Sequence, residues 1–474
     1  MASQFSSRNT DGHDMRANMA SLWLFIIEIC ALCLPAWINR SPLIFADTRA
    51  YYLGGLAALD KISSVLRHVS GTSEIGGESI DAAMQKAKGV RSAFYSLFTY
   101  IPAATVSLWL VILLQAVIIA SILRLIFKLL CPGQPMVLRT LFIVGLSMLT
   151  TLSWTTSNVM PDIFTAVVAL SLIIVVLFWT ALSTATRFAL FIAIAAGITM
   201  HLTNLPMAVG LLIIALLVAE KSAWFRAERY LQIGLIGTAI GTAVAAMLLV
   251  GVVGFKQWTL TPQAPPFMLA RSITDGPGKL YLLEHCPQLG SVMCNHLDKL
   301  DQTTDTFMWK PDGVFSAVSP EEQARLRTED KRFYLAAAKE HPWLQLGAAA
   351  QNTVIQLFTF GLREYYIPSS ADVTPTNLLI NDPRPEDLWW QFPFSIPIYL
   401  VVGIALASIA RQRKTLSRTQ RDFVILIFAT VLLEAVAGAF SEPVPRYEAR
   451  VVWLIPMTAV LLYFNTLNWR RARD

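Results

Sequence analysis

Residues 161–182 read PDIFTAVVALSLIIVVLFWTAL, and this run decides the class of the protein. It is about 20 residues long, which is the length that a helix needs to cross the hydrocarbon core of a bilayer. Its only charged residue, Asp162, stands next to its first residue. A membrane β-barrel would instead require short segments that alternate between apolar and polar residues, and none are present. The run therefore predicts a transmembrane helix.

Similar runs recur along the chain of 474 residues, of which 55% are hydrophobic and only 15% are charged. A soluble domain carries about 25% charged residues. We therefore expect an all-α integral membrane protein with about ten transmembrane helices and a large, mainly helical outer (periplasmic) region. The expected spans are 20–38, 103–127, 137–154, 161–182, 188–202, 204–219, 231–254, 393–410, 422–441 and 450–468.

Loop charge sets the expected orientation. Basic residues gather in the short loops 128–139, 221–229 and 411–421 and at the C-terminus. Short cytoplasmic loops carry such an excess, so both termini are expected in the cytoplasm, in a plasma membrane of the bacterial inner-membrane type. The net charge of +6 follows from these loops and does not indicate a nucleic-acid partner. No Walker loop or Rossmann fingerprint is present, so we expect no nucleotide cofactor.

These spans divide the chain into three expected parts. Residues 1–254 form an N-terminal transmembrane module with spans one to seven and an outer loop at 39–102. Residues 255–392 form the outer region, and residues 393–474 form a C-terminal module with spans eight to ten. Segment 343–360 is apolar enough to cross, but a crossing would place the basic loop 411–421 outside. We therefore expect it to be a helix on the outer side, lying along or against the membrane helices.

The outer region carries readable local signals. Ser319-Pro320-Glu321-Glu322 predicts a capping box and a charged helix that continues to about Glu340, where His341-Pro342 ends it. Cys286 and Cys294 share this region, and spacing alone leaves open whether they form a disulfide or two free thiols. No His-x-x-x-His pattern or cysteine cluster indicates zinc.

Charged residues next to the outer ends of the spans are the candidate functional groups. Asp47 follows the first span, Asp162 begins the fourth, and Arg446, Glu448 and Arg450 precede the last. Such residues also mark the water interface, cap helices or form local ion pairs. Glu28 lies within the first span, where a carboxylate is a functional candidate or a hydrogen-bond partner of a neighbouring helix.

A resemblance joins these positions. The Asp-Thr-x-x-Tyr pattern of Asp47 to Tyr51 resembles the first outer loop of GT-C-type membrane glycosyltransferases, which use polyprenyl-phosphate sugars. The stretch Gly89 to Tyr95, with Arg91, resembles their Arg-x-Pro-x-Tyr passage, although Ala93 replaces the proline. Met160-Pro161-Asp162 and Arg446-Tyr447-x-x-Arg450 are similar to further parts of the superfamily pattern. The resemblance covers mainly residues 20–220 and 440–468.

The resemblance implies transfer of a sugar from a polyprenyl-phosphate donor to a lipid, glycan or protein acceptor at the outer membrane face, with inversion. Asp47 matches the loop carboxylate and is assigned as general base, and Asp162 is expected to steer the acceptor. Some members of the superfamily use a divalent metal and others do not, so the resemblance does not decide whether Asp47 and Asp162 hold one. Guanidinium groups pair bidentately with phosphate oxygens. The expected substrate-binding residues are Arg446, Arg450, Tyr447, Arg91, Tyr51, Arg363 and His201, although His201 beside Asn204 and Pro206 also fits a structural kink.

Two other functions compete with this one. A polymerase or ligase that moves a whole lipid-linked glycan has many spans and an arginine-bearing outer loop, but needs no carboxylate after the first span. A secondary transporter or flippase usually shows internal repeats and broken mid-membrane helices. No repeat is evident, and Glu28 is the residue that most favours transport.

Overall fold

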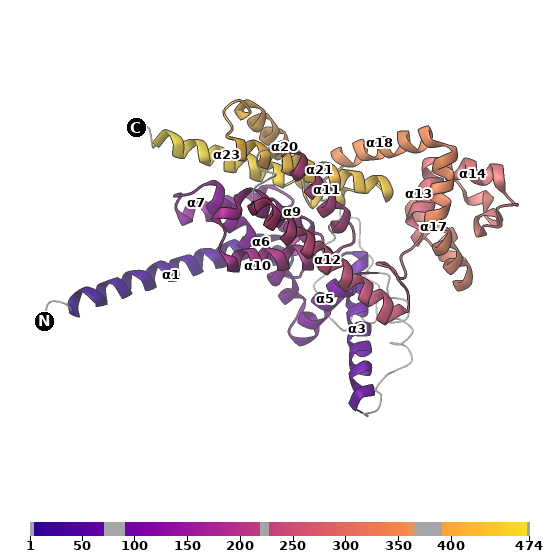
Figure 1. Cartoon of the computed structure of the whole chain (residues 1–474), viewed down its shortest axis with the longest axis horizontal. Helices are drawn as coiled ribbons and strands as arrows, with labels where there is room; N and C mark the ends of the chain where they lie inside the picture. Colours follow the sequence, from indigo (N-terminus) through magenta and orange to yellow (C-terminus); the bar gives the residue numbers. More distant parts are fainter. Residues whose placement is uncertain (1–3, 71–90, 219–226, 363–364, 366–390, 472–474) are drawn as a thin grey trace.

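A computed structural model describes residues 4–70, 91–218, 227–362, 365 and 391–471. Within these ranges the chain is helical, and the one β pairing is an isolated parallel bridge between Leu43 and Asn158. The expected all-α class is therefore confirmed. Figure 1 shows a large helical body and, at its right, a smaller helical subdomain, with α18 between them.

The helical body comprises the described residues of 4–255 and 391–471. Its helices are α1 (Gln4–Leu32), α2 (Leu34–Asn39), α3 (Ala46–Ser70), α5 (Ala93–Thr105), α6 (Leu108–Leu130), α7 (Met136–Leu149), α8 (Leu152–Ser157), α9 (Ile163–Phe178) with η1 (Trp179–Ala181), α10 (Thr184–Met200), α11 (Asn204–Val218), α12 (Ala227–Phe255), α20 (Gln391–Gln412), α21 (Arg418–Phe440), α22 (Pro445–Ala449) and α23 (Leu454–Arg471).

Six stretches of the described chain are long and apolar enough to cross a membrane, which is fewer than the ten expected spans. They are Leu108–Leu130, Ile163–Ala181, Glu228–Phe255, Ser395–Gln412, Arg418–Phe440 and Pro445–Asn465. The other four expected spans coincide with shorter apolar helices at Asn18–Leu32, Met136–Leu149, Thr184–Met200 and Asn204–Val218. A helix perpendicular to the bilayer needs about 17 residues or more, so these four stretches fall at or below the usual length.

The second expected span, 103–127, was placed too early. Residues 103–105 end α5, which contains Pro102, and α6 begins only at Leu108. The backbone N–H groups of Val106 and Ser107 both donate to the Pro102 carbonyl, which closes the end of α5. Apolar residues run through both helices, so hydropathy alone did not show the break.

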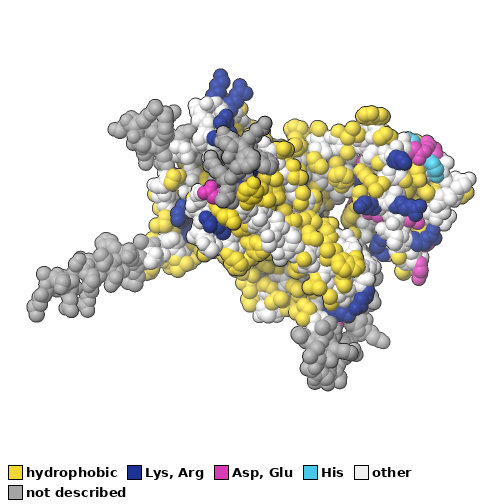
Figure 2. Space-filling view, in the orientation of Figure 1, with side chains coloured by type: hydrophobic (Ala, Val, Ile, Leu, Met, Phe, Trp, Pro, Cys, Tyr) yellow, Lys and Arg dark blue, Asp and Glu magenta, His cyan; other side chains and the backbone are white. Residues whose placement is uncertain are grey.

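Helix α9 forms the centre of the body. It is apolar around its whole circumference, and its side chains from Ile163 to Val175 are buried against α6, α10, α11 and α21. A helix that is apolar on every side is expected in the middle of a bundle. By contrast, α12 and α20 lie at the periphery and expose most of their apolar side chains. Figure 2 shows this hydrophobic surface as a broad yellow area over the body.

The helical subdomain, residues 267–340, has a hydrophobic core of its own that includes Leu269, Met293, Phe307 and Phe333. Cys286 and Cys294 are joined by a disulfide. Its helices are α13 (Phe267–Asp275), α14 (Pro277–His285), η3 (Val292–Asn295), η4 (Leu297–Lys299), α15 (Thr304–Trp309), α16 (Val314–Ala317) and α17 (Pro320–Glu340).

Helix α17 begins and ends where the sequence predicts. The Ser319 side chain accepts from the Glu322 N–H, and the Glu322 carboxylate accepts from the Ser319 N–H, so the capping box is complete. One face buries Leu326, Phe333 and Ala337 in the subdomain core, while charged side chains cover the opposite face. This is the usual polarity of a helix in water.

Helix α18 (Pro342–Phe358) follows α17 directly. Its polar side chains face the protein and its apolar side chains face outward, which is the reverse of α17. It packs against α21, and it buries the carboxamides of Gln345, Asn352 and Gln356. The Gln356 side chain donates to the Val444 carbonyl and accepts from the Val444 N–H, both at 2.9 Å. The opposite face exposes Trp343, Leu344, Leu346, Val354, Ile355 and Phe358. The expected helix against the membrane helices is therefore present, with its polar side inward.

Candidate functional site

Two loops that are far apart in the sequence are held side by side at one end of the body. The Leu43 N–H donates to the Ser157 carbonyl, and the Val159 N–H donates to the Leu43 carbonyl, each at 2.9 Å. The Gln115 amide on α6 donates to the carbonyls of Thr156 and Asn158, also at 2.9 Å. These bonds fix the loop after α2 against the loop before α9.

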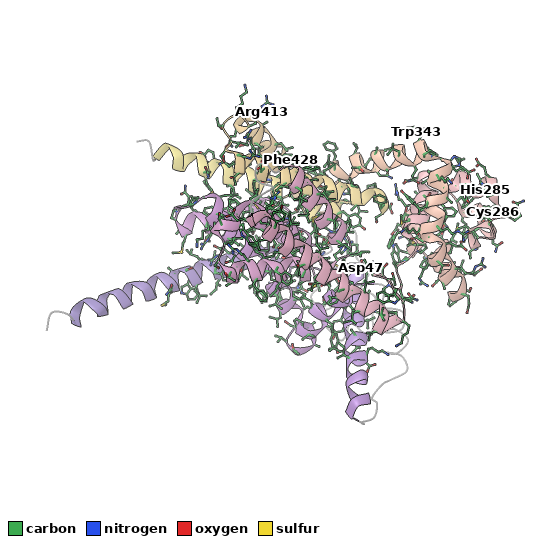
Figure 3. The ribbon with its side chains drawn as sticks, in the orientation of Figure 1. Asp47, His285, Cys286, Trp343, Arg413 and Phe428 are labelled. Atoms are coloured by element: carbon green, nitrogen blue, oxygen red, sulfur yellow. A yellow bond between two sulfur atoms is a disulfide. The ribbon has the colours of Figure 1, made fainter. Side chains whose placement is uncertain are left out.

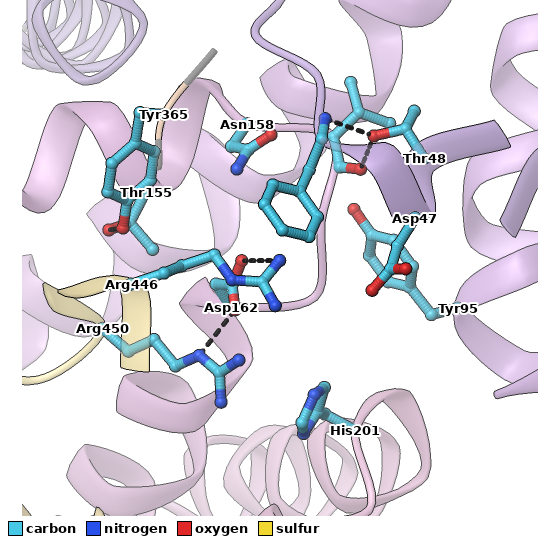
Figure 4. Close-up of polar contacts among 12 residues, drawn as sticks. Asp47, Thr48, Tyr95, Thr155, Asn158, Asp162, His201, Tyr365, Arg446 and Arg450 are labelled. Carbon is cyan, nitrogen blue, oxygen red and sulfur yellow. Dashed lines mark hydrogen bonds and ion pairs between the residues drawn. The ribbon is translucent and has the colours of Figure 1, made fainter. Parts of the chain in front are cut away.

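Thr48 extends this junction to the first turn of α3. Its hydroxyl accepts from the Phe45 N–H at 2.9 Å and donates to the Val159 carbonyl at 3.1 Å. The neighbouring carboxylate, Asp47, therefore has a defined position relative to the start of α9, where Asp162 lies. Figure 4 shows the two carboxylates in one region of the molecule.

Asp47 forms an ion pair with Arg91, which lies just before α5. The two side chains are 19% and 20% exposed respectively, so a small part of each remains accessible. The pair joins the beginning of α3 to the beginning of α5, and these two helices pack along each other. Asp47 is thus both oriented by a cation and reachable from outside.

Asp162 is in a different environment, because its side chain is fully buried. The Arg450 Nε donates to Asp162 Oδ1 at 2.5 Å, and the Arg450 Nη1 donates to Glu434 Oε1 at 3.0 Å. Arg450 and Glu434 are each 1% exposed. One guanidinium therefore lies between two buried carboxylates, and it ties α9 and α21 to the start of α23.

Arg446 stands between the two carboxylate sites. Its guanidinium carbon lies 3.8 Å from the centre of the Phe45 ring, and its Nη1 is 4.0 Å from Asp162 Oδ2. The ring of the next residue, Tyr447, lies 4.6 Å from the guanidinium carbon of Arg450. Aromatic faces attract guanidinium groups, so Phe45 and Tyr447 help to hold both arginines in place.

Tyr51 and His201 complete the predicted group. Tyr51 is buried, and its ring meets the Tyr95 ring edge-on at 4.8 Å. His201 Nδ1 contacts the Thr203 hydroxyl at 2.6 Å.

The sequence analysis allowed a structural role for the turn that contains His201, Asn204 and Pro206, and Asn204 is the residue that fills this role. Its amide donates to the Gly197 carbonyl at 2.8 Å, and its carbonyl oxygen accepts from the Thr165 hydroxyl at 2.8 Å. Asn204 thereby fastens the turn between α10 and α11 to α9. The His201 side chain is left facing the region of the arginines (Figure 4).

One residue of this site, Glu434, was not singled out from the sequence. Glu434 lies inside an expected span, where an ionisable residue is a functional candidate by default, so that signal was available. Tyr365 is buried and shares a hydrogen bond of 2.9 Å with the Thr155 hydroxyl. Nothing in its neighbouring sequence indicates this contact. Among the described residues, no hydrogen-bond partner reaches either carboxylate oxygen of the buried Glu448.

Two of the predicted positions lie elsewhere. Arg363 falls outside the described residues. The Cys286–Cys294 disulfide belongs to the subdomain, and Figure 3 places Cys286 at the outer edge of the subdomain and Asp47 in the body.

Glu28 is fully buried and forms a separate ion-pair cluster. It accepts from Arg124 Nε on α6 at 2.5 Å and from the Thr140 hydroxyl on α7 at 2.6 Å, and Arg139 lies 3.5 Å away. The carboxylate therefore links α1, α6 and α7. These contacts account for a charge inside an apolar helix.

Comparisons with protein-family models, with curated proteins and with solved structures find no match to this chain. The functional argument therefore rests on the geometry of the site.

Proposed function

We propose that the chain is a membrane glycosyltransferase that moves a sugar from a polyprenyl-phosphate donor to a lipid, glycan or protein acceptor at the outer membrane face. The observation that carries the proposal is the meeting of Asp47, Arg91 and Arg446 beside the buried pair Asp162–Arg450. These residues come from three distant parts of the sequence, and they combine a reachable carboxylate with several cations.

The proposed reaction needs both kinds of group. The acceptor hydroxyl attacks the anomeric carbon, the bond from that carbon to the phosphate oxygen breaks, and the hydroxyl proton passes to Asp47. Attack from the face opposite the leaving group inverts the configuration, as in other single displacements at sugars. The lipid phosphate leaves as an anion, and a guanidinium suits its oxygens. Arg446 and Arg91 are assigned to this role.

Arg450 and Asp162 are assigned to positioning. Two carboxylates already engage Arg450, and Asp162 is fully buried beneath it. Their ion pair holds the residues around Arg446 at a constant distance from the start of α9. Tyr447 and His201 line the same region and supply surfaces for the sugar, while the buried Tyr51 packs against Tyr95.

The proposed topology puts about ten helices in a bacterial-type plasma membrane, with both termini in the cytoplasm and the subdomain outside. The described ends of α1 and α23 point to the side opposite the subdomain, and Arg413 of a basic loop also lies away from it (Figures 1 and 3). The shorter apolar helices would cross with local thinning of the bilayer or with flanking residues that reach toward the interface.

The decisive test is the Asp47→Asn variant, purified in detergent and compared with the wild type in sugar transfer from a panel of polyprenyl-phosphate sugars. We expect a loss of about 100-fold or more, because general base catalysis contributes about 10²–10⁴-fold. Asp60→Asn is the matched control, since Asp60 is an exposed carboxylate on the same helix. It should keep wild-type activity and an equal melting temperature.

Full activity in Asp47→Asn would move the base elsewhere, with Asp162 next in line. A wild-type protein that consumes no donor in a broad panel would overturn the proposal. Flux measurements in liposomes would then test transport, and Glu28→Gln would be the first variant.

A further inference from the structure

The subdomain contains a second group of chemically active side chains, remote from the site described above. Helices α14 and α17 both end in the dipeptide Glu-His, at Glu284-His285 and at Glu340-His341. The two ends meet in a crossed arrangement. His285 Nε2 lies 3.6 Å from Glu340 Oε1, and His341 Nε2 lies 3.6 Å from Glu284 Oε2.

We propose that Glu284, His285 and Glu340, with His341 beside them, form a binding site for a divalent transition metal of the Zn²⁺ class. One ligand atom from each of Glu284, His285 and Glu340 lies within 4.8 Å of the other two. His341 faces the Glu284 carboxylate from the remaining side. Imidazole nitrogen and carboxylate oxygen are both ligands of Zn²⁺, three protein ligands leave a fourth position for water, and the two negative charges balance the ion.

The spacing of the atoms favours a shared ion over direct hydrogen bonds. A hydrogen bond between nitrogen and oxygen has its usual distance near 2.9 Å, and 3.6 Å is too long. Two ligands on one tetrahedral Zn²⁺ are separated by about 3.3 Å, given bonds of about 2.0–2.1 Å. Both crossed contacts are close to that separation. Among the described residues, the sheltered His341 Nε2 has no hydrogen-bond partner.

The surroundings of His285 match those of a metal ligand. Its Nδ1 lies 3.0 Å from the Tyr281 carbonyl oxygen, and its ring stacks on the Tyr281 ring at 4.4 Å. A proton on Nδ1 donates to that carbonyl and leaves the Nε2 lone pair pointing at Glu340. Metal-binding histidines usually have their second nitrogen held in this way, which fixes the tautomer and the ring orientation.

The backbone adds to the attraction for a cation. The carbonyl ends of α14 and α17 carry partial negative charge, and both converge on the same point. A bound ion would cross-link the ends of two helices of the subdomain, next to the Cys286–Cys294 disulfide. Figure 3 shows His285 and Cys286 together at the outer end of the subdomain. The proposed role of the ion is to fix this end, independently of sugar transfer.

The test uses the full chain in detergent, with any affinity tag removed and with the exposed thiol eliminated by Cys30→Ser. The protein is stripped with a chelator and titrated with Zn²⁺ in a calorimeter, and in parallel with Co²⁺, whose visible absorption reports tetrahedral coordination. We expect one ion per chain, a tetrahedral Co²⁺ spectrum and a melting temperature that rises with Zn²⁺.

Two ligand variants are compared with matched controls. His285→Gln and Glu340→Gln should each weaken Zn²⁺ binding by at least about 100-fold and abolish the Co²⁺ spectrum. His296→Gln, in the same subdomain, and Glu321→Gln, at the exposed start of α17, should bind like the wild type.

Equal binding by ligand variants and controls would mean an adventitious ion only, and would overturn the proposal. A wild type without stoichiometric binding, or with an octahedral Co²⁺ spectrum, would overturn it as well. If a ligand variant does not fold, the wild-type spectrum and stoichiometry still decide. None of these measurements depends on the glycosyltransferase activity.

Discussion

The helical body and the helical subdomain bury opposite kinds of side chain. Inside the body, the charged groups of Asp162, Arg450 and Glu434 are buried among apolar helices and are paired with one another. In the subdomain, the core is apolar and the charges of α17 lie mostly on its surface. Lipid offers no partner for a charge, whereas water does. The contrast fits the proposed topology, in which the body lies in the membrane and the subdomain lies in water.

The same contrast between apolar and polar buried side chains is found in two consecutive helices, α17 and α18. They are separated only by the His341-Pro342 step, yet α17 buries Phe333 and α18 buries Gln356. The exposed apolar face of α18 continues the surface of α21, against which it packs. By its polarity, α18 follows the pattern of the body. Their composition already separates the two helices, and the direction of the polar face adds that α18 packs its amides inward.

The largest expected effect concerns the buried charges of the body. Arg450→Met should lower the free energy of unfolding by about 3–5 kcal/mol, because it leaves Asp162 and Glu434 buried without their cation. The measurement is unfolding in detergent, by heat or denaturant. Arg325→Met on α17 is the control, and since Arg325 is 57% exposed it should change stability by no more than about 0.5 kcal/mol. Equal effects of the two substitutions would break the comparison.

An intermediate effect is expected at a partly buried carboxyl in the subdomain. Burial raises the pKa of Asp330 to about 6, against the opposing hydrogen bonds from the Leu269 and Met268 N–H groups. The folded state thus favours the protonated form more than the unfolded state does. Its stabilising contribution is complete below about pH 4 and is lost as the pH rises through about 6. We expect a loss of about 1–3 kcal/mol.

Hydrogen exchange of peptides from 267–340 in the intact protein, corrected for intrinsic rates, measures this loss. Asp330→Asn should flatten the dependence on pH, because an amide does not titrate in this range. If the variant keeps the wild-type slope, another group is responsible, and the environment of Asp330 is more like that of a surface residue.

The smallest effect compares two capping boxes, one in each region. Ser319 begins α17 and Ser417 begins α21, and both side chains accept from the N–H three residues later. Both lie at exposed helix ends, so Ser→Ala at either position should cost about 1 kcal/mol. Local hydrogen exchange at the first turn reads out the change, and Thr328→Ala within α17 is the control. A much larger loss at Ser417 would show that this end of α21 is shielded from water.

Local signals in the sequence predicted local structure well. Ser319, Glu322 and His341-Pro342 specified both ends of α17, since capping depends on neighbouring residues alone. The prediction for 103–127 was wrong because two consecutive helices are both apolar, and the break at Val106-Ser107 involves only backbone hydrogen bonds to Pro102. Six stretches of the described chain reach the spanning length where ten spans were expected, and among the others α7, α10 and α11 end after 14, 17 and 15 residues, because apolar composition does not set helix length.

The candidate site was predictable only in part. Asp47, Asp162, Arg446 and Arg450 were found because charge next to apolar runs is conspicuous in a sequence. Their pairing was not, since Asp47 pairs with Arg91 and Asp162 pairs with Arg450 across 288 positions. The two Glu-His dipeptides are separated by 54 intervening residues, and no short spacing rule for metal ligands includes them.

The sequence by itself determined the helical class, the apolar helices and the residues that carry charge at their ends. Apolar runs and capping signals extend over only a few neighbouring residues, so they can be recognised in the amino-acid sequence alone. Tertiary structure alone decided which carboxylate is reachable and which is buried, that α18 turns its amides inward, and that His285 meets Glu340. Those outcomes depend on packing between helices, because burial and distance are properties that distant segments create together.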